Sequence, residues 1–193
     1  MKHSTAKLPG LVSLATTARV DDFVLITAAT VVADFCHVGS HVAIVGGAPV
    51  TLQAFSGISG GCRLFSSNDA YNGSALAGPV VPNYLRNVQH GPITLQPFSM
   101  LGANTVVLPG ITIGEGAFVG AGSLVKSSLA PWGVYAGNPL RLVKMRPEHV
   151  MRRKARAVWR HYEDWQRDHG HLTWTQYLEM VHKSPSTHVA VEE

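Results

Sequence analysis

Two side chains that can accept a proton, those of Asp69 and His90, lie in one long stretch at about 67–91. A carboxylate or an imidazole acts as a general base when it lies within hydrogen-bond reach of a nucleophile. The stretch is rich in Asn, Gly, Ser and Pro and has no periodicity, and a loop of this length in a compact domain is usually functional or disordered. We therefore take it as the candidate site. Its other polar side chains that could contact a small substrate are Asn68, Asn83, Tyr84 and Arg86.

A second feature that could take part in binding is a cluster of positive charge near the C-terminal end. The chain has 16 Lys and Arg against 12 Asp and Glu. Eight of the basic residues fall between Arg141 and Arg160, where Glu148 is the single acid. Such a cluster either attracts an anion or solvates the face of a helix. No interleaving of aromatic and basic residues favours nucleic-acid binding.

The element that must position these residues is a repeat with a period of six. Between Leu95 and Val125 a branched apolar residue recurs at every sixth position, and a small or β-branched residue follows each of the first five by four positions. This period fits neither an amphipathic helix nor an alternating strand, and it is typical of a repeat fold. The apolar residues are Leu95, Leu101, Val107, Ile113, Val119 and Val125, and their companions are Ser99, Thr105, Ile111, Ala117 and Ser123.

A first block before the loop has the same frame. Its apolar position runs Leu14, Val20, Ile26, Val32, Val38, Ile44 and Val50, and continues more weakly through Ser56 and Cys62. Each hexad is a short extended segment followed by a corner, and stacked coils complete each other's core. The two blocks therefore predict a prism-shaped parallel β-helix that the long loop interrupts at one place. The hexads do not reveal its hand.

The domain organisation follows from where the frame starts and stops. We expect a β-helix domain at 11–130 interrupted by the loop at 67–91, a connector at 131–146, helices at 147–183 and a flexible tail at 184–193. Hydrophobic residues make up 46% and charged residues 15% of the chain, which excludes wholesale disorder. No apolar run is long enough to span a bilayer and no secretion signal leads the chain, so we expect no membrane insertion and a cytoplasmic location.

The six-residue frame, the phrase IGEGAFVGAGSLV at 113–125 and the phrase AGNPLRLVK at 136–144 resemble the hexapeptide-repeat acyltransferases. The chain is most similar to the sugar acetyltransferases of that family, which are galactoside and maltose O-acetyltransferases and N-acetyltransferases acting on nucleotide-linked amino sugars. The resemblance implies a left-handed parallel β-helix, a homotrimer, and acetyl-CoA as acyl donor in the groove between adjacent subunits. It also implies a sugar acceptor at each subunit interface, partly enclosed by the long loop.

The resemblance also assigns residues to the cofactor. Ala103 and Ala121 match positions where family backbones meet the pantetheine arm, and Lys126 lies near the family's cofactor contacts. Arg141 and Lys144 match basic residues that contact the nucleotide phosphates. Guanidinium and ammonium groups suit phosphate oxygens, so these assignments are chemically reasonable.

The chain departs from the galactoside-type enzymes at the base. Those enzymes place a catalytic histidine at the start of the loop, where this chain has Asn68 and Asp69. An aspartate has an ordinary pKa of about 3.9 and is a weak base, which favours an amine over a sugar hydroxyl as acceptor. His90 is the competing candidate because histidine titrates near neutral pH. The choice of base, and the choice between O- and N-acetylation, stay open at this point.

Two readings from other classes compete with an acyltransferase. A zinc enzyme of the γ-carbonic-anhydrase type shares the hexapeptide scaffold, and His37, His41 and His90 would be its three ligands. We expect no metal, because the closely spaced histidine pair of such enzymes is missing. A non-catalytic β-helix scaffold is the other alternative, although it has little use for a polar loop or for Arg141 and Lys144.

Overall fold

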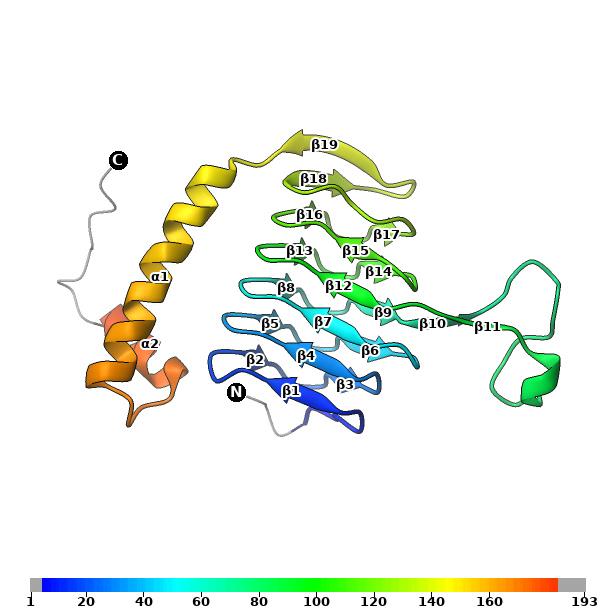
Figure 1. The fold of residues 1–193 in the computed structure, drawn as a ribbon, viewed down its shortest axis with the longest axis horizontal. Helices are drawn as coiled ribbons and strands as arrows, with labels where there is room; N and C mark the ends of the chain where they lie inside the picture. Colours follow the sequence, from blue (N-terminus) through cyan, green and yellow to red (C-terminus); the bar gives the residue numbers. More distant parts are fainter. Residues whose placement is uncertain (1–4, 184–193) are drawn as a thin grey trace.

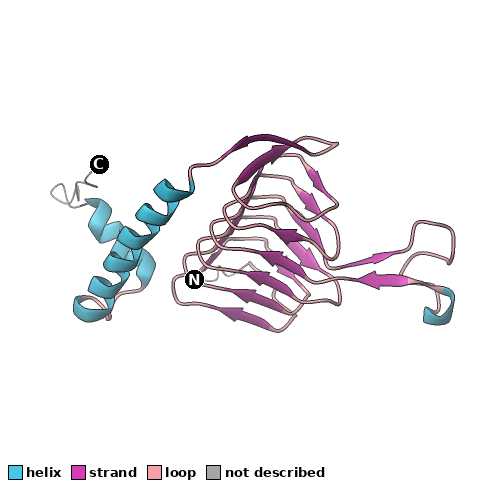
Figure 2. Cartoon of the chain, turned by 45° about the horizontal axis from the view of Figure 1, so that its top comes forward, coloured by secondary structure: helices cyan, strands magenta, loops and turns pink. Residues whose placement is uncertain are grey.

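The computed structural model describes residues 5–183, which form a three-sided prism of stacked coils (Figure 1). An arm projects from one side of the prism, and two helices lie along another (Figures 1 and 2). Neighbouring coils pair strand upon strand in parallel along each side. The predicted class, a mainly β solenoid of hexapeptide repeats with a long inserted loop and a C-terminal helical appendage, is confirmed. That the β-helix is left-handed stays a prediction.

Each side of the prism is one sheet. The first sheet contains β1 (Val12–Leu14), β4 (Thr30–Val32), β7 (Val50–Leu52), β12 (Ile93–Leu95) and β15 (Thr112–Ile113). The second sheet contains β2 (Arg19–Val20), β5 (His37–Val38), β8 (Gly57–Ile58), β13 (Met100–Leu101), β16 (Phe118–Val119), β18 (Gly133–Ala136) and β19 (Arg141–Met145). The third sheet contains β3 (Leu25–Ile26), β6 (Ala43–Val45), β9 (Arg63–Phe65), β14 (Val106–Val107) and β17 (Leu124–Val125).

The hexad positions have the roles that the pattern predicts. The six branched apolar residues from Leu95 to Val125 are 0% exposed and fill the prism. Burying one such side chain stabilises the fold by about 1.5–3 kcal/mol, which no coil could do without neighbours. The companion hydroxyls of Ser99, Thr105 and Ser123 are also buried, and each donates a hydrogen bond to the carbonyl three residues earlier. The companion position thus closes the corner as well as filling it.

The frame of the first block changes after Ile44, and here the prediction was wrong. The inward positions are Leu52, Ile58 and Leu64 rather than a continuation through Val50, Ser56 and Cys62. Two extra residues at Gly46 and Gly47 lengthen the corner and shift the frame by two, and Gly46 adopts a φ of +134° that favours glycine. Val50, Ser56 and Cys62 remain buried, so the shifted frame was hard to distinguish by hydrophobicity alone.

The corner between the first and second sheets carries a column of aromatic rings, which we call the aromatic corner. Phe35 stacks on Phe55 at 4.7 Å between ring centroids, and Phe55 stacks on Phe98 at 5.3 Å. The next coil has Gly116, and a Cβ there would lie 2.2 Å from the ring of Trp132. Trp132 therefore covers the glycine and continues the column, with its centroid 6.0 Å from that of Phe98.

The two helices, α1 (Glu148–Asp168) and α2 (Trp174–Lys183), pack against the aromatic corner. Trp159 and Tyr162 of α1 meet the ring of Phe35 edge-on. Arg146, just before α1, donates hydrogen bonds to the carbonyls of Phe98 and Gly116. The helical appendage is thus tied to several coils.

The stretch predicted as a connector, 131–146, contains β18 and β19. β18 continues the second sheet in parallel with β16, and β19 turns back and pairs with β18 in antiparallel register. This stretch closes the end of the prism. At the other end, Lys7 pairs with Leu25. The predicted tail at 184–193 lies outside the described residues, and no helix in 5–183 is long and apolar enough to cross a membrane.

The long loop is an arm built on an antiparallel hairpin. Its strands are β10 (Ser67–Asp69) and β11 (Val88–His90), and a short 3-10 helix, η1 (Asn83–Leu85), lies between them. The arm leaves the corner between the third and first sheets, which we call the arm corner, and reaches away from the prism (Figure 1). Both breaks in the hexad frame, at 46–47 and at 67–90, therefore fall at the same corner.

Candidate active site

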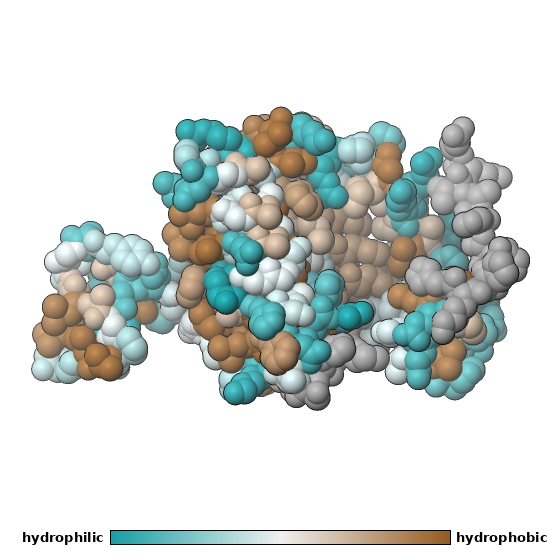
Figure 3. Space-filling model, turned by 180° about the vertical axis from the view of Figure 1, so that it is seen from behind, coloured by the Kyte–Doolittle hydropathy of each residue, from teal (hydrophilic) through white to brown (hydrophobic). Residues whose placement is uncertain are grey.

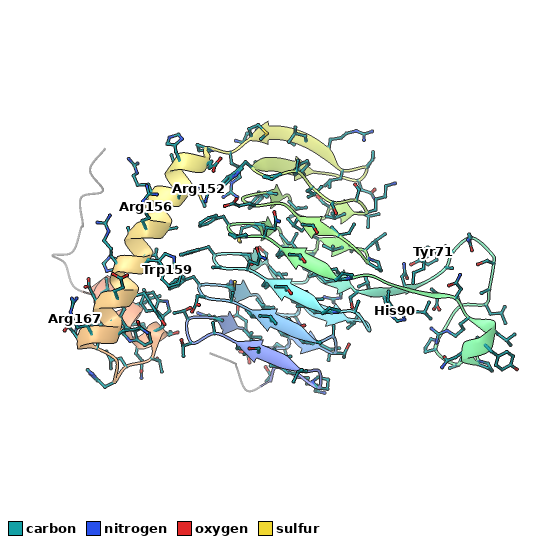
Figure 4. The ribbon with its side chains drawn as sticks, in the orientation of Figure 1. Tyr71, His90, Arg152, Arg156, Trp159 and Arg167 are labelled. Atoms are coloured by element: carbon teal, nitrogen blue, oxygen red, sulfur yellow. The ribbon has the colours of Figure 1, made fainter. Side chains whose placement is uncertain are left out.

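His90 is held where the arm joins the prism (Figure 4). β10 and β11 place Ser67 directly opposite His90, and the Ser67 Oγ lies 2.6 Å from the His90 Nδ1. The Ser67 Oγ also accepts a hydrogen bond of 2.6 Å from the Gly47 N–H of the preceding coil. The imidazole itself is exposed. An exposed base with a fixed ring is suited to taking a proton from a bound nucleophile.

Asp69 lies further along the same hairpin, and its carboxylate is paired with other residues of the arm. Its carboxylate accepts a hydrogen bond of 3.0 Å from the Gly78 N–H and pairs with the Arg86 guanidinium at 2.9 Å. The Gly78 hydrogen bond first, and then Arg86, lower the pKa of Asp69, although partial burial acts in the opposite direction. A carboxylate that is stabilised in its charged form is a weaker base. The contacts of Asp69 brace the arm across its width.

The other side chains predicted to contact an acceptor lie along the arm. Asn68 accepts a hydrogen bond from the Tyr71 hydroxyl, and Asn83 and Tyr84 lie on η1 near the tip. Tyr84 is 85% exposed. A hollow of about 510 Å³ lies between residues 73–76 and 84–87, with Tyr84 and Arg86 in its wall. The structure thus gathers Arg86 with Asp69, and keeps Asn83 and Tyr84 apart from His90.

The residues predicted to contact the cofactor lie at the corner between the second and third sheets, which we call the small corner. Ala103 and Ala121 occupy equivalent places on successive coils, because the Gly122 N–H donates to the Ala103 carbonyl at 2.8 Å. A Cβ at Gly122 would meet no atom within 4 Å, so the space outside this corner is open. Arg141 pairs with Ala136 in the β18–β19 ladder, at the end of the prism.

Lys126 lies elsewhere. It follows β17 and so belongs to the arm corner, as His90 does. The third sheet separates the two corners by a few extended residues, roughly 10–15 Å at about 3.3 Å per residue. One chain therefore places His90 and the small corner at opposite edges of one sheet. Among residues 5–183, Lys126, Arg141 and Lys144 have no carboxylate within ion-pair distance, and all three are exposed.

The three histidines of the zinc alternative do not meet within the chain. The His37 Nε2 lies 2.8 Å from a carboxylate oxygen of Asp21 on the second sheet. Partial burial alone would raise the pKa of Asp21, but its hydrogen bonds with His37 and Arg19 outweigh burial and lower it. His41 stacks on Phe23 at the small corner. His90 lies at the arm corner.

Known proteins match both the repeat and the whole fold. A family model described as bacterial transferase hexapeptide (six repeats) matches residues 92–127. The solved structure of AntD, an N-acyltransferase from Bacillus cereus, in complex with dTDP and 3-hydroxybutyryl-CoA, is 30% identical to this chain with a TM-score of 0.77. The match covers 81% of this chain and 85% of that chain. The chain belongs to the hexapeptide-repeat acyltransferases.

Other relatives of this acyltransferase place it within the family. A variant of AntD in complex with dTDP-4-amino-4,6-dideoxyglucose and Coenzyme A has a TM-score of 0.77 to it. A dTDP-4-amino-4,6-dideoxy-D-glucose acyltransferase from Escherichia coli is 29% identical over 72% of this chain and 74% of the relative. A maltose O-acetyltransferase from Clostridium difficile 630, at 20% identity and a TM-score of 0.54 over 72% of each chain, shares the fold. The family resemblance read from the hexads is confirmed.

The residues of this acyltransferase fit a CoA thioester. CoA carries several phosphate charges, which exposed cations such as Arg141 and Lys144 can neutralise. The open space outside Gly122 leaves the backbone of the small corner accessible to a thin chain.

Sequence reasoning missed two residues of the site, Ser67 and Gly47. Ser67 stood beside the chosen Asn68 and looked like an ordinary polar loop residue. Gly47 was hidden by the frame shift, because Val50 appeared to continue the hexads. The signal that could have found both is the Gly46-Gly47 pair, because two adjacent glycines mark a turn that departs from the six-residue repeat.

Proposed function

We propose that this chain transfers an acyl group from acyl-CoA to the amino group of a dTDP-linked amino sugar, with His90 as the general base. The observation that carries the proposal is the exposed imidazole of His90, held by Ser67 where the arm leaves the prism. The relatives support the substrates, since AntD binds dTDP and 3-hydroxybutyryl-CoA and the E. coli relative is named for a dTDP-linked amino sugar. Acetyl-CoA is the donor that we propose first, and 3-hydroxybutyryl-CoA is the alternative.

The donor is proposed to lie along the small corner. Its pantetheine arm would pass Ala103 and Ala121, whose side chains are single methyl groups. Its phosphates would meet Arg141 and Lys144, which are exposed and lack acidic partners among the described residues. Lys126 lies at the arm corner, so it would contact the donor from an adjacent copy of the chain. Acyl-CoA supplies an activated thioester carbonyl when it is bound.

The complete site is proposed to form between two copies of the chain in a homotrimer. The reason is that His90 and the small corner lie at opposite edges of the third sheet, so a second copy is the simplest way to bring a thioester to His90. The first sheet supports an assembly because it leaves apolar side chains uncovered, with Leu11 beside it 84% exposed and Val31 48% exposed. Association would remove these from water.

The proposed reaction is a direct transfer. The acceptor amine attacks the thioester carbonyl, and the Nε2 of His90 takes the proton that the amine loses as its new C–N bond forms. The tetrahedral intermediate then breaks its C–S bond. The leaving sulfur of CoA takes the proton from the imidazolium, which restores neutral His90 and yields an amide and free CoA.

Asp69 is the competing base, and its surroundings make it the second choice. Its carboxylate already accepts from Gly78 and pairs with Arg86, and its pKa is lowered. We propose that Asp69 and Arg86 keep the arm in shape, and that Asn68 contacts the acceptor. Asn83 and Tyr84 are proposed to contact the part of the acceptor that is remote from its amine. A base role for Asp69 would require its ion pair with Arg86 to break when the substrate binds.

The test measures CoA release with dTDP-linked amino sugars and with plain glycosides as acceptors. Activity is expected only with the former. His90→Gln is expected to lower kcat by about 10²–10⁴-fold, the usual contribution of a general base. The matched control is His149→Gln, which removes an exposed histidine of α1.

Two outcomes would contradict the proposal. Full turnover in His90→Gln with a large loss in Asp69→Asn would make Asp69 the base. Acylation of plain glycosides in preference to amino sugars would overturn the acceptor class.

A further inference from the structure

Both interruptions of the hexad frame meet at one point on the arm corner. The extra residues Gly46 and Gly47 belong to one coil, and the root of the arm at Ser67 and His90 belongs to the next. The Gly47 N–H donates to the Ser67 Oγ, and Ser66 donates its N–H to the Val45 carbonyl. The insertion is therefore in direct contact with the arm's root.

Gly47 leaves the space that the His90 ring occupies. A Cβ on Gly47 would lie 3.0 Å from the His90 Nδ1 and 3.1 Å from its Cε1, which is tighter than ordinary van der Waals contact. A side chain at 47 would have to move either the imidazole or the Gly46-Gly47 turn. The glycine thus allows the ring to lie against the preceding coil, where Ser67 can reach its Nδ1.

Ser67 makes two hydrogen bonds through its Oγ, and the donor of one of them is fixed. Among the described residues, its Oγ has two partners, the Gly47 N–H and the His90 Nδ1. A backbone N–H can only donate, so Gly47 takes one lone pair of the hydroxyl oxygen. The second lone pair remains available to the imidazole.

We infer that Ser67 is a positioning residue that accepts the Nδ1–H of His90, so that the Nε2 lone pair is directed to the acceptor amine. This inference rests on the proposed function, in which His90 is the base. It assigns Gly47 the role of fixing the Ser67 oxygen and of leaving room for the ring.

The direction follows from the proton transfer itself. Once Nε2 has taken a proton, both ring nitrogens are donors, and only an acceptor can stay paired with Nδ1. If Ser67 accepts from the start, the same hydrogen bond persists before and after the transfer. If Ser67 donated to Nδ1, neutral His90 would carry its proton on Nε2 and could not receive another there.

The first experiment determines the tautomer of His90 by NMR. The full-length protein is labelled with ¹⁵N-histidine, and the His90 signals are identified as those absent from His90→Gln. Neutral His90 is expected to carry its proton on Nδ1. This Nδ1–H should be hydrogen-bonded in the unmodified protein and should lose that hydrogen bond in Ser67→Ala. A proton on Nε2 in the unmodified protein would overturn the inference, whatever the activity measurements show.

The second experiment separates positioning from folding. Ser67→Ala is expected to lower kcat by about 10–100-fold with little change in KM, since a small misplacement of a reacting group can cost about 10²-fold. Ser67→Thr keeps the hydroxyl and should restore most of the loss. Ser128→Ala is the matched control, because the Ser128 Oγ likewise accepts a backbone N–H, that of Thr112, and among residues 5–183 it has no hydrogen bond with a histidine.

The outcomes distinguish this inference from the proposed function. Normal kcat in Ser67→Ala, or a threonine variant as slow as the alanine variant, contradicts the role of Ser67 and leaves His90 as the base. Normal turnover in His90→Gln contradicts the proposed function, while the NMR experiment still reports whether Ser67 accepts from Nδ1. If Ser67→Ala does not fold, the tautomer of the unmodified protein and the activity of Ser67→Thr still decide the matter.

Discussion

The chain adds two non-repetitive pieces to its solenoid, the helical appendage and the arm, and they relate to the prism in opposite ways. The appendage buries Trp165 and Trp174 in its own small core and packs on the aromatic corner. The arm touches the prism at its root and carries apolar side chains outward along its length. Figure 3 shows brown side chains gathered at the arm's tip, where Leu76 is 59% and Val80 93% exposed.

From this difference we expect the appendage to contribute stability and the arm to contribute activity. The appendage is fastened by charge as well as by rings, since Arg152 pairs with Glu115 of the prism and lies over the Trp132 ring. The arm has internal braces, such as Asp69 with Arg86, and its exposed tip has no counterpart on its own chain among the described residues. Removing the arm should therefore affect turnover, and weakening the appendage should affect stability.

The largest effect is expected from shortening the arm. Replacing 68–89 by Asn-Gly keeps Ser67 and His90 opposite each other and closes the hairpin with a favoured two-residue turn. Turnover should fall by about 10³-fold, because binding energy from remote contacts with the acceptor is lost from the transition state. The thermal midpoint should hardly change. Steady-state kinetics and a thermal melt measure the two quantities, and a protein that melts early but turns over normally would reverse the comparison.

A smaller effect, on stability alone, is expected from Trp165→Ala. This side chain is 8% exposed and meets Tyr162 and Trp174 in the core of the appendage. Truncating a buried aromatic typically costs about 3–5 kcal/mol in the free energy of unfolding. Denaturant unfolding should show this loss, and kcat at saturating substrates should stay the same below the melting range. Tyr71→Ala, on the exposed part of the arm, is the control that should leave the unfolding curve in place.

The smallest effect is expected from acid on the brace of the arm. The pKa of Asp69 is lower in the folded arm than in an unfolded chain, so its contribution to stability is present above pH of about 4 and is lost as the pH falls through the folded pKa. The protection of the Gly78 amide from hydrogen exchange, relative to an unstructured amide at the same pH, should fall as the pH drops below about 4. Asp69→Asn should exchange fast at neutral pH already and lose this dependence. Equal exchange in both proteins at pH 7 would show that the carboxylate does not brace the arm.

Much of the fold follows from residue types and a period of six. The hexads from Leu95 to Val125 predict the inward positions, because a short coil has one inward place per side and only branched apolar residues fill it. The phrase AGNPLRLVK identifies the family, although not that its residues form β18 and β19. The frame shift at Gly46-Gly47 was not predicted, because the nearby Val50 is apolar and buried and so fits the unshifted repeat as well.

The candidate site was likewise predicted only in part from the sequence. Composition and period are local properties, so they predict a long polar arm with Asp69 and His90 that interrupts a solenoid with small corners. Which of the two side chains is free to act as a base depends on contacts between coils and within the arm. Parallel stacking brings Gly47 of one coil to Ser67 of the next and leaves the His90 ring exposed, whereas the fold of the arm commits Asp69 to Gly78 and Arg86. These pairings join residues 9 to 23 positions apart, and no local pattern could reveal them.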